Sequence, residues 1–175
     1  MDIISTKALR LLQNLCSLKE INKKLLPLND EFKPSKEYEY FSIKDYFPYI
    51  YEESINLLIE LSILMRREAE KEIKYGCSIN SKVKYSSMAS YESGGSISFY
   101  DILSKIIHAE EIEYEMKIGD KICGYGYSSD RNSHFSGNAI ITGLDKSSKK
   151  YTAKIDVIKF CINIFSYTAD QYDLM

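Results

Sequence analysis

The sequence predicts an α+β fold in which helices cover one face of a small antiparallel sheet. Its 175 residues are 45% hydrophobic and include 8 glycines and 3 prolines, a composition that suits one compact core. Apolar residues recur with helical spacing over much of residues 1–107, whereas segments within 111–156 alternate with a period of two. We therefore expect a single domain over residues 1–175, with a long N-terminal helix pair, a short helix, about three strands and a buried C-terminal helix.

The first predicted helix begins at Ser5 or Thr6, because either side chain can cap it. Its apolar residues are spaced three and four apart, which predicts one face buried within the domain. The helix should end near Leu26, since Pro27 lacks an amide hydrogen and disfavours helical angles in its predecessor. Residues 27–47 are then expected to form a long, acidic, tyrosine-rich loop.

A second and longer helix is predicted from Pro48 to Tyr75, just before Gly76. Proline suits the first turn of a helix, where its missing hydrogen-bond donor costs little. The middle of this helix is apolar on more than one side, so we expect it to be the central helix of the domain.

The segment 76–98 is rich in serine and glycine and is expected to be a mobile loop. Ser98 and Asp101 then form a capping motif for a short helix that ends near Ile107.

Two patterns predict the sheet. In the segment 111–116, glutamates alternate with apolar residues, which is typical of a half-buried strand whose acidic face is solvated. The runs 138–145 and 150–157 are joined by a polar turn and predict an antiparallel hairpin. Asp156 can cap the final helix, whose apolar residues are too many for one face.

The composition disfavours several classes of function. A net charge of -2 gives no general attraction to nucleic acid or anionic lipid. No apolar stretch reaches the length of about 20 residues that a membrane-spanning helix needs, and no secretory signal is visible. The four cysteines lie tens of residues apart without metal-ligand spacing, so we expect reduced thiols in a cytoplasm, no metal and no cofactor.

The segment from Asp30 to Glu60 is the most unusual part of the sequence. It holds eight acidic residues, three lysines and five tyrosines, which gives a local charge of -5. Tyrosine supplies rigid contact area and carboxylates attract a basic partner, so the segment is typical of a protein-binding surface. The expected partner-binding residues are Glu37, Tyr38, Glu39, Tyr40, Asp45, Tyr46 and Tyr49. The competing interpretation is that several of these rings cover the helix pair.

These observations predict a non-enzymatic cytoplasmic module that binds another protein, as inhibitor or immunity proteins do when they mask a basic surface. The alternative is a small hydrolase or nuclease that uses Asp130, Arg131 and His134, a trio with the ingredients for proton transfer and phosphodiester binding.

A third interpretation is nucleic-acid binding by the basic end of the second helix. Six basic residues fall within 66–84, namely Arg66, Arg67, Lys71, Lys74, Lys82 and Lys84. Interleaved glutamates dilute this stripe, which favours a solvated helix face instead.

Overall fold

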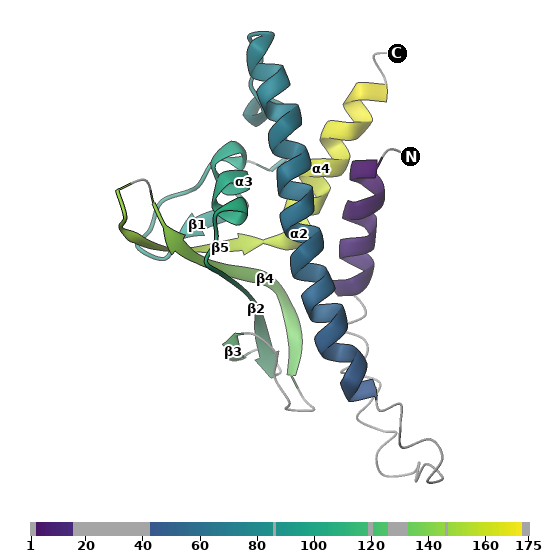
Figure 1. Ribbon diagram of the computed structural model, residues 1–175, viewed down its shortest axis with the longest axis vertical. Coiled ribbons are helices and arrows are strands. Elements are labelled where there is room, and N and C mark those ends of the chain that lie inside the picture. Colours follow the sequence, from purple (N-terminus) through teal and green to yellow (C-terminus); the bar gives the residue numbers. More distant parts are fainter. Residues whose placement is uncertain are drawn as a thin grey trace.

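The structure is a computed structural model that describes residues 3–15, 43–85, 87–118, 121–125, 133–145 and 147–172. The side chains of 43–47, 123–125, 133–134 and 170–172 are outside this description. An N-terminal helix over residues 3–15 is followed by nine further elements, whose helices α2–α4 and strands β1–β5 are labelled in Figure 1. These are α2 (Ile43–Lys74), the 3-10 helix η2 (Ile79–Ser81), β1 (Ala89–Tyr91), α3 (Phe99–Ile107), β2 (Glu111–Ile118), β3 (Lys121–Tyr125), β4 (Ser133–Leu144), β5 (Lys150–Asp156) and α4 (Val157–Tyr172).

The expected α+β class is confirmed, but the sheet has five strands instead of about three. The strand order is β1-β5-β4-β2-β3, and every pairing is antiparallel. The predicted hairpin is the β4–β5 pair, and the alternating glutamate segment lies in β2. The additional strands β1 and β3 are short, and no strand was expected in their segments. Strands of three and five residues carry too little alternation to be recognised and depend on their ladder partners.

The sheet is curled, and an irregularity between β2 and β4 accounts for part of this shape. Tyr114 pairs with Ala139 and Met116 with Phe135, so the single residue Glu115 lies opposite three residues of β4. Within that bulge Gly137 has φ 101°, a conformation that side chains other than glycine rarely adopt. Figure 1 shows β4 bending along its length.

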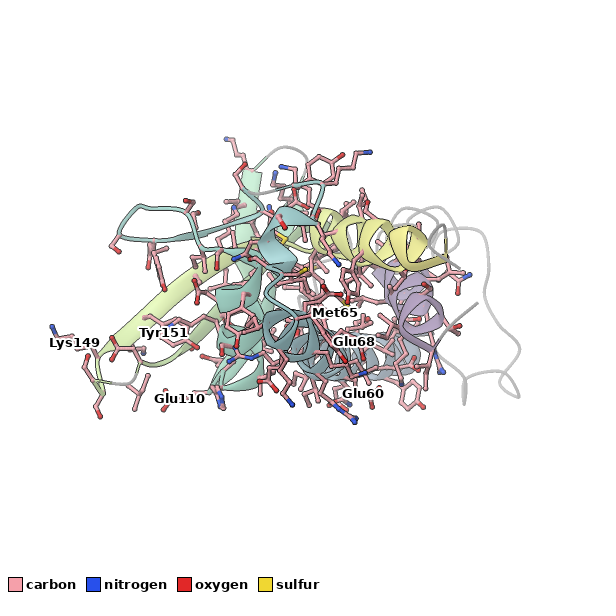
Figure 2. The ribbon with its side chains drawn as sticks, turned by 90° about the horizontal axis from the view of Figure 1, so that it is seen from above. Glu60, Met65, Glu68, Glu110, Lys149 and Tyr151 are labelled. Carbon is pink, nitrogen blue, oxygen red and sulfur yellow. The ribbon has the colours of Figure 1, made fainter. Side chains whose placement is uncertain are left out.

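Helix α2 lies at the centre of the helical layer, as its apolar middle predicts. Figures 1 and 2 show α2, α4 and the N-terminal helix lying together to one side of the sheet. Leu58, Leu61 and Met65 are fully buried, and they belong to one core cluster with residues of the N-terminal helix, α3, α4 and the sheet. One continuous core therefore joins the helices to the sheet.

Two predicted helix starts are wrong, and two are confirmed. Ser5 lies inside the N-terminal helix, where its hydroxyl is 2.8 Å from Thr168 Oγ1 of α4. Helix α2 begins at Ile43, so Pro48 lies inside it, and the one amide hydrogen bond that the proline removes is outweighed by the packing of a long helix. At α3 the Ser98 side chain accepts from the Asp101 amide, and at α4 Asp156 accepts from the Lys159 amide.

We predict that Leu61→Ala lowers the free energy of unfolding by about 2–5 kcal/mol, because truncating a fully buried leucine leaves a cavity. Urea unfolding followed by circular dichroism would measure this loss. Since one core joins helices and sheet, a single cooperative transition is expected. Two transitions, with the substitution shifting only one of them, would contradict the single domain.

Candidate interaction surface

Three residues from two distant parts of the sequence form the acidic tyrosine surface: Tyr51 of α2 with Glu111 and Glu113 of β2. The helical spacing of α2 leaves Tyr49 65% exposed and Glu52 exposed, whereas Tyr51 is turned toward the sheet. In β2 the strand alternation leaves Glu111 exposed and Glu113 half-buried.

Tyr51 makes the contact that joins the two halves of this surface. Its ring lies edge-on to the buried ring of Tyr114, with centroids 5.3 Å apart and planes at 88°. Its hydroxyl oxygen accepts a hydrogen bond of 3.1 Å from the Tyr114 backbone N–H. A side chain of α2 thus satisfies a backbone donor at the edge of the sheet.

The electrostatics of the acidic tyrosine surface are unbalanced. Burial raises the pKa of Glu113, and the nearby charge of Glu111 raises it further. Burial also raises the pKa of Tyr51. The hydrogen bond from the Tyr114 amide partly opposes this rise, and the charges of Glu113 and Glu111 add to it. Among the residues that the structure describes, Glu52, Glu111 and Glu113 form no ion pair. A positive charge brought to this place would relieve the repulsion.

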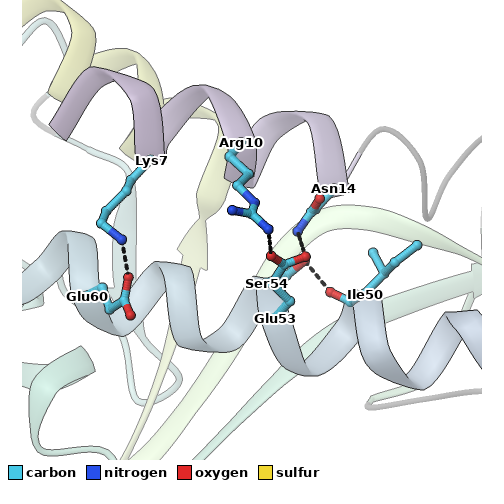
Figure 3. A network of polar contacts seen from close by, with 7 residues as sticks. All are labelled: Lys7, Arg10, Asn14, Ile50, Glu53, Ser54 and Glu60. Carbon is cyan, nitrogen blue, oxygen red and sulfur yellow. Dashed lines mark hydrogen bonds and ion pairs between the residues drawn. The ribbon is translucent and has the colours of Figure 1, made fainter. Parts of the chain in front are cut away.

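Two other acids of the tyrosine-rich segment have an internal role instead (Figure 3). Glu60 pairs with Lys7 at 2.5 Å, and Glu53 pairs with Arg10 and accepts from Asn14 Nδ2 at 3.0 Å. These contacts fasten α2 to the N-terminal helix, so Glu53 and Glu60 are already neutralised.

The expected partner-binding residues divide into three groups. Tyr49 is exposed, as a contact residue must be. Asp45 and Tyr46 lie in the first turn of α2, with side chains outside the described part. Glu37, Tyr38, Glu39 and Tyr40 lie outside the described residues.

Glu111 and Glu113 were expected only as a solvated strand face, and the sequence gives no signal that they lie beside Tyr51. Their proximity arises from tertiary packing across some sixty residues of chain.

The expectation that Glu115 also faces solvent is wrong. Glu115 is 1% exposed and lies at the bulge. Lys154 Nζ donates to its Oε2 at 2.6 Å, and Asn138 Nδ2 donates to its Oε1 at 3.0 Å. Burial alone would raise the pKa of Glu115, but hydrogen bonds from Lys154, Ser136 and Asn138 outweigh it and hold the pKa below its ordinary value.

The residues of the alternative catalytic site are only partly described. His134 lies in β4 instead of a loop, paired with Lys117 of β2, and its side chain is outside the described part. Asp130 and Arg131 lie outside the described residues, so the trio stays a prediction.

Three of the six basic residues of the segment 66–84 form ion pairs with neighbouring glutamates. Arg66 donates to Glu70 and to Ser104 Oγ and lies 3.8 Å from the centre of the Tyr100 ring. Lys71 pairs with Glu68, and Lys82 pairs with Glu72. This arrangement favours the solvated helix face over a nucleic-acid site.

Within the described ranges, no cluster of three or more His, Cys, Asp or Glu side chains has a metal-binding arrangement. None of the described helices combines the length and the apolar character needed to cross a bilayer. Comparisons with protein-family models, with curated proteins and with solved structures give no match for this chain.

We predict opposite effects for two hydroxyl deletions. The buried hydroxyl of Tyr114 has no hydrogen-bond partner among the residues that the structure describes, so Tyr114→Phe should leave stability unchanged or raise it by about 1 kcal/mol. Tyr51→Phe leaves the Tyr114 amide without its acceptor and should cost about 1–2 kcal/mol. Thermal and urea unfolding of both variants would test this. A larger loss for Tyr114→Phe than for Tyr51→Phe would contradict the assignment.

The depressed pKa of Glu115 predicts how acid affects stability. Because the folded-state pKa is below the ordinary value of 4.5, the ionised carboxylate stabilises the fold above that pH and loses its effect as the pH falls through the folded-state pKa. Glu115→Gln should therefore cost about 1–3 kcal/mol near pH 7, and its difference from the wild type should shrink below pH 4.5.

Urea unfolding across this pH range would measure the difference. The exposed Glu92→Gln is a matched control. A gap between Glu115→Gln and wild type that stays constant with pH would show that the carboxylate charge is not what stabilises the bulge.

Proposed function

We propose that this chain is a small cytoplasmic protein-interaction module. It binds the basic surface of a partner protein, in the manner of an inhibitor or immunity protein. The observation that carries the proposal is the acidic tyrosine surface, where the carboxylates of Glu111 and Glu113, without an ion-pair partner among the described residues, lie beside the half-buried ring of Tyr51. Interfaces are enriched in tyrosine, and opposite charges across them steer association.

The charge distribution supports a basic partner in particular. Elsewhere in the described chain, seven acidic residues form ion pairs with lysine or arginine, whereas Glu92, Asp101, Glu110 and Asp145 do not. The acids around Tyr51 lack such a counterpart among the described residues, and Glu113 is already partly desolvated. An incoming lysine or arginine would therefore meet carboxylates that have given up part of their hydration before binding.

The two cysteines whose side chains the structure describes support a reducing compartment. Cys77 is an exposed free thiol, and Cys161 is a free thiol whose burial raises its pKa to about 12. Free thiols are the rule in the cytoplasm.

The proposal predicts that charge reversal on this surface abolishes partner capture. The tagged chain is used as bait in extract from its source organism, and captured proteins are compared quantitatively with those of the double variant Glu111→Lys/Glu113→Lys. We expect a basic protein whose capture falls about tenfold or more in the variant and weakens as salt is raised.

Glu92→Lys is the matched control, because it makes the same change at an exposed position in the turn after β1. Circular dichroism checks that every variant is folded. Equal capture by wild type, the double variant and the control would contradict the proposed function.

A further inference from the structure

The strand β3 covers only half of β2. It pairs with the part of β2 from Glu115 to Ile118, and among the described residues no strand pairs with 111–114 on that side. Within the described part of the chain, the first half of β2 is therefore an unpaired sheet edge next to the acidic tyrosine surface.

The hydrogen bond to Tyr51 shows which backbone groups face this edge. The Tyr114 N–H points away from β4 and donates to the Tyr51 hydroxyl, which occupies the position of a neighbouring strand's carbonyl. In an antiparallel strand this direction repeats every second residue, so the N–H and C=O of Ile112 face the same edge. Ile112 can thus exchange two hydrogen bonds with an added strand.

The other sheet edges suit a basic strand less well. The outer side of β1 is closed, because the Tyr91 amide donates to Gly95 O and the Ile97 amide to Ala89 O. The outer strand β3 begins at Lys121, and β2 carries Lys117 nearby, so positive charges border that edge. At the open edge of β2, by contrast, Ile112 lies between Glu111 and Glu113.

We propose that the partner docks by adding an extended segment to this edge of β2, with lysine or arginine opposite Glu111 and Glu113 and an apolar residue opposite Ile112. Side chains directly opposite one another on adjacent strands lie close enough for ion pairs, which sets the alternation. This inference rests on the proposed function and specifies the form of the partner as an alternating basic and apolar strand.

The test uses two synthetic peptides of alternating lysine and valine. The second peptide is N-methylated at every other residue, which keeps its charge but removes the donors that strand pairing needs. Binding to the whole chain is measured by fluorescence anisotropy, and hydrogen exchange of the Ile112 amide is followed by NMR. We expect the unmodified peptide to slow exchange at Ile112 and the N-methylated peptide to bind about tenfold more weakly.

The variant Glu111→Gln/Glu113→Gln should weaken binding of the unmodified peptide, whereas Glu92→Gln should not. Equal binding of both peptides, without protection of Ile112, would overturn strand addition and leave the acidic surface as a plain electrostatic contact. Binding of neither peptide at about millimolar concentration would also overturn strand addition, while the capture experiment judges the proposed function separately.

Discussion

The helix α2 has to be covered on two sides, and the rest of the fold is arranged around that requirement. Leu57, Leu58 and Leu61 are buried and point to more than one face of the helix, so a single neighbour would leave apolar surface in water. The N-terminal helix covers one side and is held by the pairs to Glu53 and Glu60. The α3 side is held by Arg66, which reaches the side chains of Ser104 and Tyr100, and the buried interior connects both sides to the sheet. Position and orientation of α2 are thereby fixed, and with them the position of Tyr51.

The bulge between β2 and β4 is the second constraint on the acidic tyrosine surface. Gly137 permits the positive φ, which residues with a side chain rarely adopt. The buried carboxylate of Glu115 ties Asn138 to Lys154 of β5 across this irregular stretch. The bulge coincides with the point where β3 begins to pair with β2. The half of β2 that β3 leaves unpaired and the half that it pairs are therefore separated by an irregular stretch of backbone, which Gly137 permits and the buried carboxylate of Glu115 holds.

Local signals in the sequence predict those parts of the fold that local interactions determine. Ser98 and Asp156 cap their helices as expected, and the alternation in β4 and β5 identifies the hairpin. The start of α2 is different, because packing along a helix of 32 residues outweighs the proline signal at Pro48. Glu115 is different for a similar reason, since its burial depends on Lys154 and Asn138, which lie 39 and 23 residues away.

The sequence predicts only part of the candidate surface, because tertiary packing decides which residues lie together. Tyrosine and acid enrichment around Tyr49 is visible in the sequence, and so is the row of glutamates in β2. What the sequence does not contain is their proximity, which requires α2 to lie against the sheet with Tyr51 directed at Tyr114. Sequence patterns also do not separate the acids that fasten α2 to its neighbour from those left without a cation, because helical spacing alone does not name the partner helix.

The cost of the acidic tyrosine surface to the free protein is consistent with a role in binding. Glu111 and Glu113 repel each other and Glu113 is partly desolvated, so both effects disfavour the charged, unbound state. Glu115 and Glu72, by contrast, each have a lysine beside them. An arriving cation would relieve the repulsion between Glu111 and Glu113. The electrostatic free energy gained on binding is therefore larger than it would be if the same carboxylates were already paired in the free protein. The same reasoning applies to the Tyr51 hydroxyl, which satisfies a strand-edge donor in the free protein and keeps that edge ordered without closing it.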